Sequence, residues 1–287
     1  NIKGIWLEED YVRKYPYNTL ACDVLGFTVA GNVGTGGIEA SYNSVLNGTD
    51  GREYGYLDEN SDFERTVKEP ENGSTIVSTI DLQVQSIVER NILEFNNEHK
   101  NEARKGEGSK NTAVIVMNPQ NGEILAEASY PNYDLNNPRD LTKYYSEKSL
   151  KAMSDEERIE KLNELWKNFC VTDTYEPGSV FKIITAAAGL EEEVVSVDSA
   201  FSCPGFIVVE DRKIRCHKTG GHGGQTFLEG TMNSCNPVFV TTGLRLGADR
   251  FYEYFEKFGL LEKTGIDLPG EAGTIMHQKE NIGLVEL

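Results

Sequence analysis

Residues 175–182 read Tyr-Glu-Pro-Gly-Ser-Val-Phe-Lys and continue into the apolar run Ile183–Leu190. The Pro-Gly pair indicates a turn, after which the chain can start a helix. A helix that is apolar on every face is a buried one, so the run predicts a central core helix. Ser179 and Lys182 are the polar side chains near its start, and their spacing places them on one face of the first turn.

A lysine next to a serine at the start of a buried helix favours nucleophilic chemistry. Desolvation lowers the pKa of a lysine, so that it can act as general base on a neighbouring hydroxyl. The helix N-terminus supplies partial positive charge where an oxyanion would form. The alternative is that Ser179 only caps the helix while Lys182 extends to water. The Ser-x-x-Lys pattern occurs once in the chain, but a pattern this short does not by itself decide between the two.

The composition is that of a globular protein with room for one large domain or two ordinary ones. The chain has 287 residues, of which 38% are hydrophobic and 26% charged. The net charge of −18 argues against a nucleic-acid partner, which would need a basic face. No apolar run approaches the ~20 residues of a membrane span. The five cysteines are scattered and odd in number, unlike a disulfide framework.

The first part of the chain predicts a β-rich module followed by a helix. Residues 1 to about 74 are polar and rich in glycine, with many short strand-like pieces. Asp81 is placed to cap an amphipathic helix that carries apolar residues at spacings of three and four. Residues 97–110 are charged and lack a core pattern, so we place a domain boundary near residue 110.

The rest of the chain predicts a hairpin and then a block of helices, which together indicate an α+β fold. The hairpin strands are Thr112–Met117 and Glu123–Ala126, joined by an Asn-Pro-Gln-Asn-Gly turn. Helices are expected over 146–168, after Ser179, over Val238–Leu246 with Pro237 in the first turn, and from Asp249 to Gly259.

These motifs resemble those of the class B (monofunctional) penicillin-binding proteins, including the elongation, division and sporulation types of Gram-positive bacteria. The resemblance extends over nearly the whole chain. It is carried by residues 13–27 and 37–48 (pedestal), Ser78–Asp81 (linker helix), Met117–Ser129 (first transpeptidase hairpin), Asp173–Lys182 (nucleophile box) and Asn233–Pro237 (second box). It implies a β-rich pedestal of the dimerisation type with its linker helix over residues 1–110. It also implies the N-terminal part of a transpeptidase domain, with a serine β-lactamase-like fold, over residues 111–287.

The resemblance also assigns roles to four side chains. Ser179 would be the nucleophile and Lys182 its base, Ser234 would relay protons, and Asn236 would bind the substrate amide. Ser-x-Asn is a weak pattern alone, because two other places in the chain fit it. Only the Ser234 match follows the Ser179 helix and opens a proline-led helix, as the family's second box does.

The family's third motif, Lys-Thr-Gly, occurs twice, and neither copy has the expected setting. Lys218-Thr219-Gly220 lies between the other two boxes, and Lys263-Thr264-Gly265 precedes a turn. In the family this motif lies on a strand after the second box. We therefore expect both copies to be chance matches and the working motif to lie beyond Leu287. On that expectation these residues alone form an incomplete transpeptidase domain and a poor enzyme.

The function implied by the resemblance is peptidoglycan cross-linking through a serine acyl-enzyme at D-Ala-D-Ala, a site that β-lactams also acylate. The expected partners are stem peptides, β-lactam antibiotics and, through the pedestal, other cell-wall synthesis proteins. The expected location is the extracytoplasmic face of the bacterial membrane, with the anchor outside these residues. The alternatives are a serine β-lactamase and a β-lactam sensor or scaffold without turnover. No cofactor is required for this chemistry.

A second constellation is rich in cysteine and histidine, with Cys203, Cys216, His217 and His222 within twenty residues. Thiolates and imidazoles are good zinc ligands, so Cys203, Cys216 and His222 are candidate ligands of a structural zinc ion. The spacing is not that of a zinc knuckle. Two buried thiols, or a disulfide, in a glycine-rich loop with ordinary histidines remain the alternatives.

Overall fold

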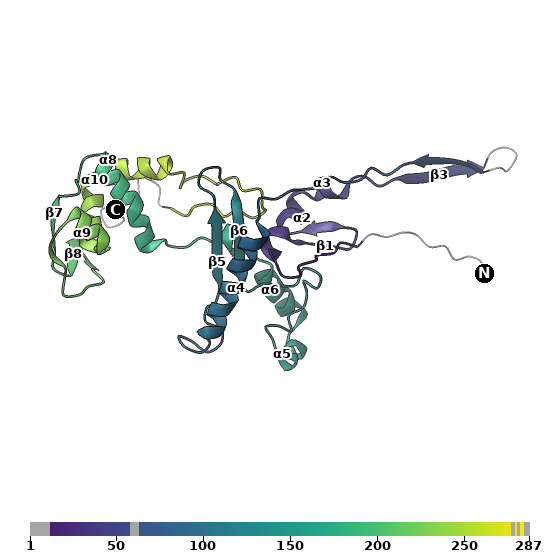
Figure 1. The fold of residues 1–287 in the computed structure, drawn as a ribbon, viewed down its shortest axis with the longest axis horizontal. Helices are drawn as coiled ribbons and strands as arrows, with labels where there is room; N and C mark the ends of the chain where they lie inside the picture. The colour runs from purple at the N-terminus through teal and green to yellow at the C-terminus, as the bar shows by residue number, and fades with distance from the viewer. Residues whose placement is uncertain (1–11, 58–62, 277–278, 280–281, 284–287) are drawn as a thin grey trace. The chain divides into compact units, whose positions relative to one another are not determined.

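The computed structural model describes residues 12–57, 63–276, 279 and 282–283. The chain forms two compact units, coloured in sequence order in Figure 1. The first unit extends to Asp173 and includes Asp267–Glu271, and the second unit contains Thr174–Ile266 and the residues after Glu271. Each unit is described separately below.

The N-terminal part of the first unit consists of short elements. They are α1 Cys22–Leu25, β1 Phe27–Val29, β2 Val33–Thr35, α2 Gly37–Ser41, α3 Asn43–Asn47, β3 Arg52–Leu57 and β4 Phe63–Lys68. β1 pairs with β2, and β3 pairs with β4 as an antiparallel ribbon. Gly26 has a φ of 70°, and a Cβ there would lie 2.0 Å from the carbonyl oxygen of Gly36, so only glycine fits this crossing.

A long helix and a hairpin form the centre of the first unit. Helix α4 (Leu82–Glu98) is capped as predicted, since the Asp81 side chain accepts from the backbone N–H groups of Gln83 and Val84. The predicted hairpin is confirmed as β5 Thr112–Met117 and β6 Ile124–Tyr130. β6 extends four residues past the predicted end because both of its faces are covered. Its Ala128 and Tyr130 pack on α4, while the Glu127 and Ser129 side chains are buried in hydrogen bonds.

The charged segment after the hairpin is helical, as predicted. It forms α5 Glu147–Ala152 and α6 Asp155–Leu165, followed by the short α7 Phe169–Thr172. A capping box between Ser154 and Glu157 starts α6. The segment is not wholly solvated, because Leu162 and Leu165 are buried in a core with Phe27.

In its described residues, the second unit contains three α-helices and four short strands. Its elements are the 3₁₀ turn η1 Gly178–Phe181, α8 Lys182–Glu191, β7 Ala200–Cys203, β8 Phe206–Val209, β9 Arg212–Arg215, β10 Gly223–Thr226, α9 Phe227–Met232 and α10 Asn236–Lys257. β7 pairs with β10 and β8 with β9, both antiparallel. α10 contains the two helices predicted from the sequence, which meet at a kink where Gly247 has a φ of 73°.

The prediction of a helix buried on every side is wrong for α8. Thr185, Ala188 and Gly189 are buried, whereas Ile183 is 69% exposed. The reason is that α10 covers one face of α8, and in the described ranges nothing encloses the opposite face. No helix among the described residues is long and apolar enough to cross a bilayer.

Candidate active site

The two predicted catalytic residues of the first box lie where the 3₁₀ turn η1 passes into α8. Gly178 opens the turn with a φ of 58°, which suits glycine. A 3₁₀ turn repeats every three residues, so side chains at positions i and i+3 lie above one another. Ser179 and Lys182 therefore point to the same side, with Ser179 exposed and Lys182 half-buried.

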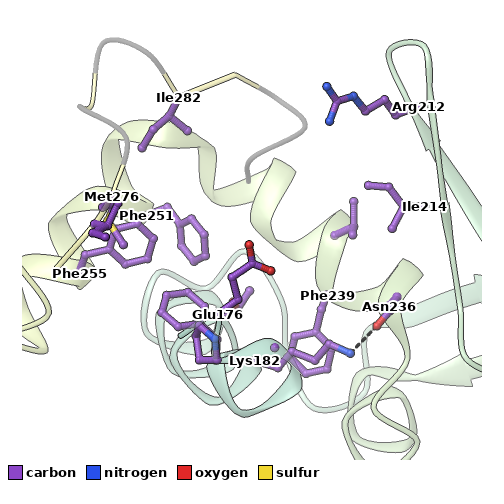
Figure 2. A pocket seen from close by; sticks show the side chains of 16 residues that line it. Glu176, Lys182, Arg212, Ile214, Asn236, Phe239, Phe251, Phe255, Met276 and Ile282 are labelled. Carbon is purple, nitrogen blue, oxygen red and sulfur yellow. Dashed lines mark hydrogen bonds between the residues drawn. The ribbon is translucent and has the colours of Figure 1, made fainter. Parts of the chain in front are cut away.

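Lys182 joins the first box to the second. Its Nζ donates to the Ser234 carbonyl oxygen (2.9 Å), the Ser234 Oγ (3.2 Å) and the Asn236 Oδ1 (2.5 Å). Figure 2 shows the bond to Asn236. Among the described residues, Ser179 Oγ has no hydrogen bond. Lys182 is thus hydrogen-bonded to both predicted residues of the second box. Ser179, the fourth predicted residue, is exposed one turn before Lys182.

The second box is shaped by the junction of α9 and α10. Ser234 adopts a left-handed conformation with a φ of 46°, and the Cys235 N–H donates to the Gly230 carbonyl oxygen. Asn236 then begins α10, where Pro237 fits the first turn. The Asn236 Nδ2 donates to the Arg215 carbonyl oxygen at the end of β9, 2.8 Å away. Both the oxygen and the nitrogen of the Asn236 side-chain amide are therefore hydrogen-bonded, which fixes its orientation.

Burial makes the ammonium form of Lys182 less favourable than that of an exposed lysine. Burial lowers the pKa of Lys182, and the neighbouring thiols of Cys216 and Cys235 oppose the shift only in part. The Nζ also lies 5.4 Å from the centre of the Phe239 ring. A lysine that releases its proton more easily than usual can accept one from a serine hydroxyl.

A pocket of about 920 Å³ opens over these groups (Figure 2). Lys182 and Asn236 line it together with the Phe181 and Phe239 rings.

Neither Lys-Thr-Gly copy lies on a strand: Lys218–Gly221 forms a turn, and Lys263–Gly265 is irregular. Neither copy lines this pocket.

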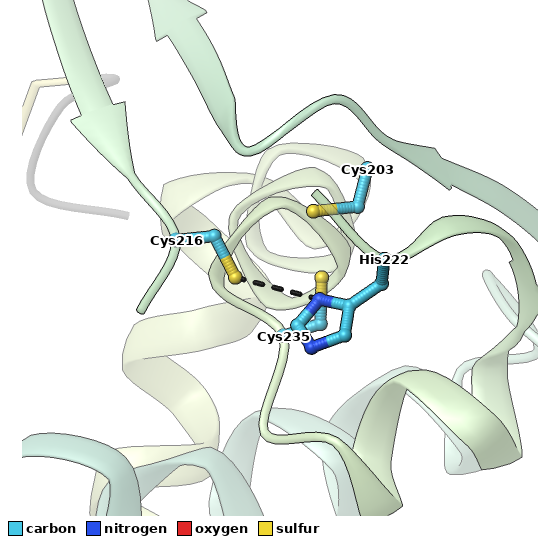
Figure 3. A group of neighbouring side chains, drawn as sticks. All are labelled: Cys203, Cys216, His222 and Cys235. Carbon is cyan, nitrogen blue, oxygen red and sulfur yellow. Dashed lines mark hydrogen bonds between the residues drawn. The ribbon is translucent and has the colours of Figure 1, made fainter. Parts of the chain in front are cut away.

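The cysteine and histidine residues come together as a second cluster, drawn in Figure 3. The ligand atoms of Cys203, Cys216, His222 and Cys235 all lie within 4.8 Å of one another. The three cysteines are buried and free. His217 is outside this group, although its Nδ1 lies 3.9 Å from the Cys216 Sγ.

Cys235 was missed by the sequence reasoning. It lies inside the Ser-Cys-Asn box, so its role as part of that box hid its proximity to the other thiols. The signal that could have identified it in the sequence is a third cysteine shortly after the segment that contains Cys203 and Cys216.

Burial raises the pKa of Cys203, but hydrogen bonds from the backbone and ring of His222 outweigh it and lower the pKa to about 6.

An exposed serine one turn before a partly desolvated lysine, which is itself bonded to a second serine and an asparagine, is the arrangement expected in serine-type acyltransferases. Comparison with known families agrees with this class. Residues 112–285 match the penicillin binding protein transpeptidase domain, and residues 1–78 match the penicillin-binding protein dimerisation domain. The chain belongs to the class B penicillin-binding protein transpeptidases, which confirms the resemblance and the predicted fold class.

Individual relatives are longer than this chain. Stage V sporulation protein D of Bacillus subtilis is 38% identical over 291 residues, covering 100% of this chain and 41% of that protein. The peptidoglycan D,D-transpeptidase MrdA of Acinetobacter baumannii is 27% identical, covering 94% and 40%. Penicillin binding protein 3 of Mycobacterium tuberculosis complexed with ampicillin has a TM-score of 0.72 at 26% identity, covering 95% and 52%. The chain therefore spans about two fifths of the curated relatives it matches.

Proposed function

We propose that this protein is a peptidoglycan D,D-transpeptidase that cross-links stem peptides through an acyl-enzyme at Ser179. Family membership supports the reaction class. The observation that carries the proposal is the set of hydrogen bonds from Lys182 to Ser234 and Asn236, because it joins the two sequence boxes into one site. The proposed base and substrate-binding amide line one pocket, and the proposed nucleophile directly follows Gly178, which also lines it.

In the first half-reaction, the Ser179 Oγ attacks the carbonyl carbon of the penultimate D-Ala while Lys182 takes the hydroxyl proton. The oxyanion forms against the backbone N–H of Ser179 at the start of η1 and α8. The peptide C–N bond then breaks, and terminal D-Ala leaves after its nitrogen receives that proton through Ser234. Asn236 positions the peptide chain of the substrate. The reaction uses these side chains and the backbone N–H of Ser179, and it requires no cofactor.

In the second half-reaction, an amine of a second stem peptide attacks the ester carbon. The C–N bond of the cross-link forms, the C–Oγ bond breaks, and an amine proton returns to Ser179 by way of Lys182. A β-lactam would enter the same first step and remain as a stable ester, because its ring opens without releasing a leaving group.

Fluorescent penicillin tests this function and separates it from the alternatives. Labelling that persists for hours at Ser179, together with cross-linking of stem peptides, is the expected result. Labelling that decays within minutes would instead indicate a serine β-lactamase. Persistent labelling without any peptide transfer would indicate a sensor, and absence of labelling by the full-length protein would indicate a scaffold.

We also propose the larger organisation implied by the family. Residues 1–110 would form the pedestal with its linker helix, and residues 111–287 would belong to the transpeptidase domain. The pedestal would bind other cell-wall synthesis proteins at the extracytoplasmic face of the membrane. The exposed rings of Tyr54 and Tyr56 on the β3–β4 ribbon support a binding role. Pull-down of wall-synthesis proteins by the wild type, lost in a Tyr54→Ser, Tyr56→Ser double variant, would test it.

Finally, we propose that Cys203, Cys216 and His222 hold a structural zinc ion, with Cys235 as the fourth ligand. The support is the clustering of four ligand atoms of the types that zinc binds in a tetrahedron. Protein purified without chelators should contain about one zinc per chain, and removing it should lower the melting temperature. Cys216→Ser should have the same effect, and Cys170→Ser, a thiol of the first unit, should not. A content far below one zinc per chain would contradict the proposal, and the cysteines would then be buried free thiols or form a disulfide.

A further inference from the structure

A basic face on the β8–β9 hairpin has no part in the acyl-transfer steps above. It consists of the exposed side chains of Lys213 and Arg215 on β9 and of Lys218 in the turn that follows. Within the described part of the chain, none of these three side chains takes part in an ion pair or a hydrogen bond. The chain has 46 acidic residues against 28 basic ones, so this face carries a local charge opposite in sign to that of the whole protein.

The alternation of side chains along β9 separates the basic face from the active-site pocket. Arg212 and Ile214 line the pocket (Figure 2). Successive side chains of a strand point to opposite sides, so Lys213 and Arg215 point to the other side of the hairpin. A ligand bound to them therefore does not occupy the pocket.

Lys218 lies at the same end of the hairpin as Arg215. Arg215 pairs with Phe206 at the start of β8. The preceding residue, Gly205, packs against the turn that carries Lys218, because a Cβ on it would lie 2.1 Å from the Thr219 carbonyl oxygen. The turn thus extends the positive charge of β9 beyond the end of the strand.

The acidic residues of the hairpin lie at its other end. Glu210 and Asp211 form the turn between β8 and β9, remote from Lys218. In the basic face itself, the Lys213 Nζ lies 3.8 Å from the centre of the Phe206 ring. This contact holds the ammonium group against the hairpin surface without neutralising its charge.

We propose that the basic face binds a linear polyanion in which phosphodiester groups alternate with short polyol units. Side chains two residues apart on a strand are separated by ~7 Å, as Lys213 and Arg215 are in sequence. Consecutive phosphates joined through the three carbons of a glycerol unit have a similar spacing. The planar guanidinium of Arg215 also matches two oxygens of one phosphate. This binding goes beyond the proposed transpeptidase function and does not depend on it.

The basic face adjoins the second box through the backbone of β9. The Arg215 carbonyl oxygen accepts a hydrogen bond from the Asn236 Nδ2, 2.8 Å away, while the Arg215 side chain belongs to the basic face. A polymer held on one side of β9 leaves the pocket on the other side open. Binding therefore anchors the protein to the polymer without blocking acylation.

The test measures binding of the full-length protein to fluorescently labelled poly(glycerol phosphate) by anisotropy. The wild type should bind this polymer more tightly than poly-L-glutamate with the same number of charges, and less tightly as the salt concentration rises. The triple variant Lys213→Gln, Arg215→Gln, Lys218→Gln should bind ~10-fold more weakly, the loss expected when three exposed charge contacts are removed. Lys213→Gln alone should weaken binding about twofold, and it replaces the triple variant if that variant does not fold.

A second triple variant controls for net charge. Lys148→Gln, Lys151→Gln, Arg158→Gln on α5 and α6 removes three cations from the first unit and should leave binding intact. Equal weakening by the two triple variants would refute the proposal. Equal binding of poly-L-glutamate, or binding to phosphatidylglycerol vesicles without binding to the free polymer, would refute it as well.

Penicillin acylation of Ser179 separates this proposal from the proposed function. The acylation rate should be the same with and without the polymer, and the same in Lys213→Gln as in the wild type. Inhibition of acylation by the polymer would show that it occupies the pocket and would refute the assignment to the basic face. Absence of acylation in a wild-type protein that binds the polymer would refute the proposed function alone.

Discussion

Lys182 is the residue on which the proposed chemistry depends most, because it must exist as a free amine and also hold the second box. Arginine keeps the positive charge but cannot give up its proton at accessible pH. Lys182→Arg should therefore lower the rate of penicillin acylation by ~10²-fold or more, within the range of general-base catalysis. Stopped-flow labelling measures this rate, with Lys213→Arg as the matched control. A rate near that of the wild type would mean that Lys182 acts only through its charge.

The lowered pKa of Lys182 also predicts a pH profile. Burial disfavours the ammonium form, so the fraction of free amine rises at lower pH than for an ordinary lysine. The acylation rate should increase with pH and reach its plateau below the usual lysine pKa of ~10.4. Measuring the rate between neutral and alkaline pH tests this. A rising limb centred at or above the usual lysine value would contradict the effect of burial.

Asp23 is a buried residue whose charge matters for stability. Its Oδ2 accepts a hydrogen bond from the Ser129 Oγ (2.5 Å), while Oδ1 has no partner among the described residues. Burial raises its pKa to about 7, and the nearby carboxylates of Glu127 and Glu89 add to the shift. The folded protein therefore holds a proton on Asp23 that the unfolded chain would release.

This difference sets the sign of a pH dependence. A folded-state pKa of about 7 against an ordinary value of 3.8 gives stability that is present at low pH and is lost as pH rises through that window. Asp23→Asn removes this loss, so its stability relative to the wild type should increase between pH 5 and pH 8 by on the order of a few kcal/mol. Urea unfolding at both pH values measures it, with Asp211→Asn on the surface as the control. A difference that is the same at both pH values would contradict the assignment.

At the scale of elements, the packing of α8 on α10 brings the two boxes together. Gly189 on α8 allows the close approach, because a Cβ at this position would lie 2.6 Å from the Thr242 Cγ2. α8 carries Lys182 and α10 carries Asn236, so a change in their spacing moves the base away from the amide. The helix pair thus connects core packing to the site.

Gly189→Ala should lower the free energy of unfolding by about 1–3 kcal/mol, the range for overpacking a core. It should also slow acylation, because the Lys182–Asn236 contact would lengthen. Gly220→Ala is the matched control, since a Cβ there meets nothing within 4 Å. Chemical denaturation and penicillin labelling supply the two readouts. An unchanged stability in Gly189→Ala would show that the two helices can separate without loss.

Local patterns predicted the elements whose signals are themselves local. The Asp81 cap, the turn between β5 and β6, and Pro237 in the first turn of α10 are decided by neighbouring residues, and each was found as expected. The exposure of Ile183 was not predictable, because it depends on how much of α8 its neighbours cover. The pairing of β7 with β10 joins distant strands of ordinary composition, and no pattern within either strand encodes it.

At the scale of the whole chain, the sequence motifs supplied the proposed catalytic residues but not the contacts between them. The hydrogen bond between Lys182 and Asn236 connects residues 54 positions apart, and the clustering of Cys235 with Cys203 depends on how β7 meets α10. Such contacts follow from the tertiary fold, so the sequence could suggest the four proposed catalytic residues but neither their geometry nor the membership of Cys235 in the cysteine cluster.

The division into two units predicts which part of the chain acylation stabilises. All four proposed catalytic residues belong to the second unit, so a covalent penicillin adduct should stabilise that unit. Amide hydrogen exchange should slow over α9 and the start of α10 and stay unchanged over α4 in the first unit. Lys182→Arg, treated in the same way, is the control. Equal protection in both units would contradict a response confined to the second one.

The most direct test of the account is to identify the residue that penicillin acylates in the full-length protein. Mass spectrometry of peptides from the labelled wild type should find the adduct on Ser179. Ser179→Ala should remove labelling without changing the melting temperature, because the exposed hydroxyl contributes little to packing. An adduct on any other serine, or labelling that survives in Ser179→Ala, would contradict the assignment of Ser179 as the nucleophile.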